Sequence, residues 1–274
     1  MIEQLKQLKW PLIILLFMSG VAFTIFAVNE TYSNKQWIAS LASGFGVSFI
    51  SIIATVILIN MFISQKDKQQ KNKIKNACIK TLRKPIDDIS NVVFNIVKAT
   101  SNCRQEDGNQ DLEAFFRYID ISHVRLLNTS LIAPVLPQMS WDIYLLNAFE
   151  ELTKKIQNFI EKYAVHLDFE TIDLCEKIAT HVFVKYLRLN IIMNNELSNA
   201  GVKREELPTS LMFVSIVHND TSIMSDYFGL LADLTKLIAS TQEDNQIIVY
   251  HTWGDHVAPK LGSALINYKV NEAS

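Results

Sequence analysis

Two long apolar runs open the chain, at residues 10–28 and 37–64, and neither contains a charged residue or a histidine. As helices they would be roughly 28 and 42 Å long, and the hydrocarbon core of a bilayer is about 30 Å thick. Lipid offers the backbone no hydrogen-bond partners, so runs of this length cross it as helices. The octet between them is too short to form a domain. The pattern predicts a transmembrane helical hairpin over residues 1–64.

After residue 64 the apolar positions recur at steps of three and four, the spacing of helices that pack through one face. The pattern predicts helices over about 65–99, 111–128, 140–166, 168–199, 221–240 and 257–268, and a loop over 101–110. Two β-branched stretches, 211–217 and 246–250, fit either short strands or buried helix. The predicted fold class is mainly α: the hairpin, then a cytoplasmic α-helical bundle, with room for a short β element near the C-terminus.

Charge divides the chain after the second run. Residues 85–274 carry 15 basic and 25 acidic side chains, a net charge of −10. Such a surface repels phosphate backbones, so direct nucleic-acid binding by this body is not expected. A basic cytoplasmic protein, or a ribonucleoprotein complex, is the expected partner. The segment before the body, residues 65–84, is instead a basic stalk with eight basic side chains: Lys66, Lys68, Lys71, Lys73, Lys75, Lys80, Arg83 and Lys84.

The basic stalk and Lys6 and Lys9 set the expected orientation. Basic residues flanking spans stay in the cytoplasm, so both termini are predicted there, in a multi-pass membrane protein. A retained anchor is favoured over a cleaved signal peptide because the first run is long and a second follows at once. The stalk lacks neighbouring aromatic residues, which favours lipid head groups over RNA as its contact.

Pro85 lies within the helical pattern that follows the stalk. A proline in a helix interior removes a backbone hydrogen bond, so a kink or a new helix start is expected at Lys84–Pro85. This junction is a candidate hinge between the stalk and the body.

Small residues form one face in the first half of the second run, at steps of three and four. Such faces let membrane helices approach closely. Two interpretations are open: a packing seam with Ser19, Gly20 and Thr24 of the first run, or an oligomeric bundle in which this face lines a water path. The face consists of Ser40, Gly44, Ser48, Ser51 and Thr55.

Only one stretch has the residue types of a catalytic or metal site. His251, Asp255 and His256 lie within six residues, but no second ligand group stands at metal spacing, and Gly254 favours a turn. A turn with a packed Trp253 is the preferred interpretation. Three scattered cysteines fit neither a disulfide framework nor a zinc site. No cofactor and no enzymatic activity are expected.

A two-span hairpin that carries a helical cytoplasmic domain resembles the membrane effectors of bacterial anti-phage abortive-infection systems, including the two-span effectors associated with retrons. The resemblance is one of architecture and transfers no functional residue. It implies an effector that self-associates and compromises the inner membrane when a partner complex releases or activates its cytoplasmic domain. The alternative is a membrane-tethered scaffold, without catalysis, whose acidic body docks a basic protein.

Overall fold

The computed structural model describes residues 13–14, 16–25, 27–28, 36–103, 107–119, 121–202, 222–253 and 260–266, without the side chains of 36–39, 41–43 and 121–122. The chain forms two compact units, residues 1–73 and 74–274. The boundary between the units falls inside the basic stalk, eleven residues before Lys84. The fold is mainly helical, with one two-stranded sheet among the described residues.

The first unit contains most of helix α2 (Gln36–Lys80), which begins with the second apolar run. Among the described residues one helix is long and apolar enough to cross a membrane, and only 6% of its most apolar window is buried. A core helix of a soluble protein would be mostly buried. The first apolar run is described at residues 13–14, 16–25 and 27–28, all helical, and Leu16–Ile25 is shorter than a full span. The structure therefore supports one candidate span and leaves the second as a prediction.

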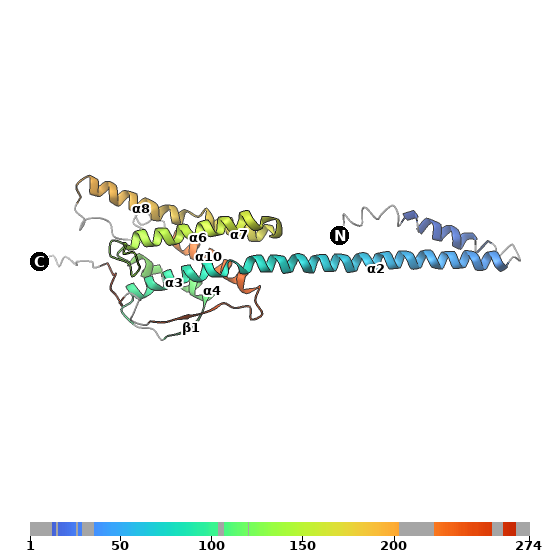
Figure 1. Cartoon of the computed structure of the whole chain (residues 1–274), viewed down its shortest axis with the longest axis horizontal. Coiled ribbons are helices and arrows are strands. Elements are labelled where there is room, and N and C mark those ends of the chain that lie inside the picture. The colour runs from blue at the N-terminus through green and yellow to red at the C-terminus, as the bar shows by residue number, and fades with distance from the viewer. Residues whose placement is uncertain are drawn as a thin grey trace. The chain divides into compact units, whose positions relative to one another are not determined.

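The second unit is a bundle of helices around one core (Figure 1). Helix α10 (Ser222–Ala239) packs against α3 (Arg83–Thr100), α4 (Leu112–Tyr118), α7 (Phe169–Ala179) and α8 (Val182–Asn199). Helix α6 (Trp141–Tyr163) packs against α3, α7 and α8.

Aromatic rings occupy the centre of this bundle. Phe183 stacks on Tyr227 with ring centroids 4.7 Å apart and meets the edge of Phe149 at 5.0 Å. Phe149, Phe183, Tyr227 and Phe228 each expose 2% of their surface or less. Burial of such large apolar side chains is the main favourable contribution to folding.

A small antiparallel sheet joins two distant parts of the body. Strand β1 (Gly108–Asp111) pairs with β2 (Ile248–His251), and Gly108 lies opposite His251. The last three residues of the stretch 246–250 therefore belong to a strand. Its partner lies in a segment whose glycine and polar residues had indicated only a loop. The companion stretch 211–217 lies outside the described residues.

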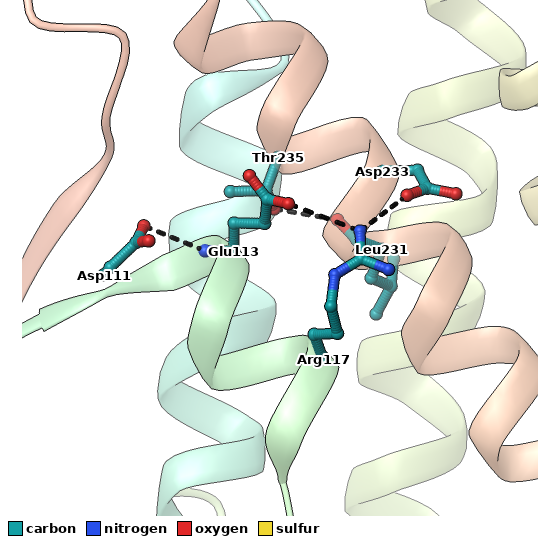
Figure 2. Close-up of polar contacts among 6 residues, drawn as sticks. All are labelled: Asp111, Glu113, Arg117, Leu231, Asp233 and Thr235. Carbon is teal, nitrogen blue, oxygen red and sulfur yellow. Dashed lines mark hydrogen bonds and ion pairs between the residues drawn. The ribbon is translucent and has the colours of Figure 1, made fainter.

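Helix α4 is tied to α10 by charge at the surface (Figure 2). Asp111 caps α4 by accepting from the Glu113 amide at 3.2 Å. Arg117 donates to Asp233 on α10 at 2.8 Å and to Glu113 at 3.3 Å. The Arg117–Asp233 pair links the short helix α4 to α10, although an exposed ion pair of this kind contributes little stability.

Two expected helices are each divided into two shorter helices, and a third does not form in its described residues. The 111–128 helix ends at Tyr118, and α5 (Ile121–Arg125) follows. The 168–199 helix breaks at Thr180, and α8 starts with His181 as its N-cap, where Nδ1 accepts from the Phe183 amide at 3.2 Å. Residues 260–266, expected to be helical, instead form turns.

Candidate functional site

The predicted small-residue face of α2 is open. The side chains of Ser40, Gly44, Ser48, Ser51 and Thr55 are all exposed, and a Cβ atom built on Gly44 would meet nothing within 4 Å. Two of the hydroxyls are satisfied inside the helix: Ser48 donates to the Gly44 carbonyl and Thr55 to the Ser51 carbonyl, each at 2.8 Å. This face needs no outside hydrogen-bond partner for these two side chains.

The opposite face of α2 packs on the first apolar segment. Gly46 is buried, and a Cβ atom built there would lie 2.9 Å from the Phe23 ring. Phe49, Ile53 and Val56 follow at steps of three and four and are half-buried. At 100° per residue this stripe lies on the far side of the helix from the small-residue face.

The contact between α2 and the first apolar segment is thus made by the Gly46 side of α2 and not by the small-residue face that the sequence had suggested. Of the three small residues expected to meet the Ser40–Thr55 face, Ser19 is buried, but Gly20 and Thr24 are exposed. The Thr24 hydroxyl donates to the Gly20 carbonyl of its own helix. Because Gly46 has no Cβ atom, the Phe23 ring can approach the backbone of α2 closely at this position.

The eight side chains of the basic stalk do not form one uniform surface. Lys66, Lys68, Lys71, Lys73, Lys80 and Lys84 are exposed. Lys75 and Arg83 are half-buried and engage carboxylates of the body: Lys75 pairs with Asp168, and Arg83 holds both oxygens of Asp87 at 2.8 Å. Six of the eight charges therefore face solvent, while Lys75 joins the end of α2 to the start of α7 and Arg83 pairs within its own helix, α3.

A new helix begins at the Pro85 junction, as predicted, but it starts two residues before the proline. Helix α2 ends at Lys80 and α3 starts at Arg83, so Pro85 lies in the first turn, where its missing N–H has no intrahelical partner to lose. Leu82 and Ile86 on either side of it are buried in the core. The helix break is thus packed inside the body.

His251 is buried in an aromatic cluster. Its ring stacks on Phe94 at 4.0 Å and contacts Phe115 at 5.4 Å, and 3% of its surface is exposed. Burial, with a smaller effect of the nearby Lys98 charge, lowers the pKa of His251 to about 4. The imidazole is therefore neutral at physiological pH, and Nε2 has no hydrogen-bond partner among the described residues.

The rest of the histidine-containing stretch is only partly described. Trp253 is buried beside Phe94, and its amide donates to Asp107 at 2.7 Å, which agrees with the preferred interpretation of a packed tryptophan. Asp255 and His256 lie outside the described residues. Within the described ranges no three His, Cys, Asp or Glu side chains are grouped to hold a metal ion.

An open pocket of about 380 Å³ lies beside this cluster and was not anticipated from the sequence. Phe94, Phe115, Tyr118 and His123 contribute rings to its lining. These residues come from α3, α4 and α5, whose alignment follows from tertiary packing and not from any local motif.

The cysteines show no feature of a reactive site. Cys78 and Cys175 are buried, and Cys103 is exposed. Burial raises the pKa of Cys175 to about 12, which keeps its sulfur in the weakly nucleophilic thiol form.

Comparison with known proteins gives no relative: no protein-family model, no curated protein and no solved structure matches the chain.

Proposed function

We propose that the protein is an effector of bacterial anti-phage defence embedded in the inner membrane. Residues 1–64 cross the bilayer twice, with both termini in the cytoplasm. Copies associate through the small-residue face of α2, and the assembly permeabilises or depolarises the membrane. A cytoplasmic partner complex triggers this step by releasing or activating the body at 85–274.

The proposal rests on one observation: α2 has two opposite faces, of which one packs against the first apolar segment and the other is exposed. The chain uses the Gly46 stripe for its own first segment, so the face from Ser40 to Thr55 has no role in that contact. Small residues at this spacing are the preferred contact surface between membrane helices. A helix that served only as an anchor needs hydrophobicity, but it does not need a second close-approach surface.

Exposed apolar side chains on α2 support the membrane location. Phe45, Val47, Leu58 and Phe62 each expose more than half of their surface, and they lie on sides of the helix away from the Gly46 stripe. Continuous exposed apolar surface of this kind is unstable in water and is typical of a lipid-facing helix.

The test is toxicity and dye uptake in cells that express the full chain with its activating partner or at high level. Gly44→Leu is accommodated within the chain, because nothing lies within 4 Å of its Cβ position, but it blocks close approach of another copy. We expect it to abolish dye uptake while the protein still inserts. Two control variants should retain activity: Gly44→Ala, which stays small, and Ala54→Leu, which places the same leucine side chain on the flank between the two faces.

Equal toxicity of inserted wild type and Gly44→Leu would remove the small-residue face from the mechanism. Absence of depolarisation in every activated state would instead favour the scaffold function. The acidic net charge of the body is what supports that second candidate, since it suits a basic protein partner. A pull-down with the full chain would then recover a protein whose association weakens with salt and survives nuclease.

A further inference from the structure

The tip between α6 and α7 presents two apolar side chains to solvent. The 3-10 turn η1 (Ala164–His166) and the start of α7 form this tip, where Val165 exposes 94% and Phe169 80% of their surface. The core-facing side of α7 consists of Thr171, Cys175 and Ile178, so Phe169 lies on the other side of that helix. Neither side chain contributes to the packing of the bundle.

Asp168 holds this tip beside α2. Its Oδ1 accepts from the Thr171 amide at 3.2 Å and caps α7, and its Oδ2 accepts from Lys75. The tip is therefore fixed against the part of α2 that lies in the second unit.

Lys75 lies in the same helix as the second apolar run and follows it closely in sequence. Lys75 follows Ser64, the last residue of that run, by eleven residues, which is about 16 Å as helix. The head-group layer beyond the hydrocarbon is about 5–8 Å thick. An apolar run of about 42 Å fits a hydrocarbon core of about 30 Å by tilting, and tilt brings Lys75 nearer to the surface.

We propose that Val165 and Phe169 dip into the head-group region of the leaflet from which α2 emerges, so that the body rests on the membrane through this tip. The inference rests on the membrane location in the proposed function and adds a second lipid contact to it. Exposed Lys162 lies at the same end of α6, but exposed Glu161 and Glu170 lie there too, so the contact rests on the two apolar side chains and not on attraction to anionic head groups.

The experiment places an environment-sensitive fluorophore (NBD) at single cysteines of the full chain, reconstituted into vesicles of phosphatidylethanolamine and phosphatidylglycerol. Cys103→Ser removes the exposed native thiol, while Cys78 and Cys175 are buried. The label is attached at Phe169→Cys. Leu136→Cys is the matched control, because Leu136 is 92% exposed but precedes the other end of α6. Phe62→Cys reports on the span.

We expect the label at position 169 to emit further to the blue than the label at 136, to resist quenching by iodide, and to be quenched by lipids spin-labelled near the head group. If iodide quenches positions 169 and 136 equally while position 62 is protected, the tip does not touch lipid and the membrane span stands. If position 62 is open to iodide as well, the membrane location fails and the tip contact fails with it.

Discussion

Asp168 gives the sharpest quantitative test of the body, because one carboxylate performs two separable tasks. Oδ1 caps α7, and Oδ2 pairs with Lys75. Loss of an N-cap costs about 0.5–2 kcal/mol. The Asp168 side chain is 39% exposed, so the ion pair adds only about 0–1 kcal/mol. Asp168→Ala should therefore destabilise α7 by about 0.5–3 kcal/mol, whereas Asp168→Asn retains a capping oxygen and loses only the charge.

Cys175 on α7 provides the assay. Its thiol is fully buried, so a thiol reagent modifies it only after local opening, and the labelling rate follows the population of the open state. Each 1.4 kcal/mol changes this population about tenfold. We expect Asp168→Ala to raise the labelling rate of Cys175 roughly tenfold and Asp168→Asn to raise it by about fivefold at most.

Cys78 is the internal control, since it is buried near the end of α2 and is followed by mass spectrometry in the same sample. Faster labelling of Cys175 alone indicates local opening of α7, and a parallel rise at Cys78 indicates global unfolding. If the Asp168→Ala protein labels Cys175 at the wild-type rate, Asp168 does not stabilise α7 and the capping argument is refuted.

Two further predictions concern the core. The pKa of His251 is about 4 in the folded protein, and that of an unfolded histidine is about 6.5. The free energy of unfolding should therefore fall by up to about 3 kcal/mol as the pH drops from about 6.5 to 4, because the unfolded chain binds the proton first. The variant His251→Phe should flatten this pH dependence in thermal melts. A pH dependence unchanged in the variant would contradict it. Phe183→Ala leaves a cavity beneath Tyr227 and Phe149 and should cost about 3–5 kcal/mol, measured by denaturant unfolding monitored at buried Trp141; a loss below about 1 kcal/mol would argue against this core.

The helices of the body could be predicted wherever their determinants are local. Asp111 and Asp168 cap α4 and α7, and the apolar stripe of α6 faces the core along its whole length. Gly201 ends α8 with a φ of +87°, a conformation that glycine adopts without strain. These signals depend on a few neighbouring residues, so they are visible without the fold.

Features that depend on distant partners could not be predicted. Residues 260–266 carry a helical pattern, yet the Ala264 amide donates to the Ala99 carbonyl and Leu265 pairs with Leu127, and these tertiary contacts replace a helix. Strand β1 exists because β2 lies beside it. The pocket lined by Phe94 and Phe115 likewise arises from α3, α4, α5 and β1, which the fold brings together. On α2, spacing identified a small-residue face, but only the contact of Gly46 with Phe23 shows which side of the helix the chain itself uses.

That division of α2 into an occupied and an open side constrains the symmetry of any assembly. If the open side of one copy meets the same side of another, the contact is isologous and growth stops at two copies. A ring that surrounds a lumen requires a heterologous contact, in which the Ser40–Thr55 side meets a different surface of the next copy. The outward side of the first segment, where Ile14, Phe17 and Val21 are exposed, is an apolar surface of that unit that could serve as this partner. A dimer and a pore would therefore be distinguished by which residues crosslink to position 48: position 48 itself, or position 17.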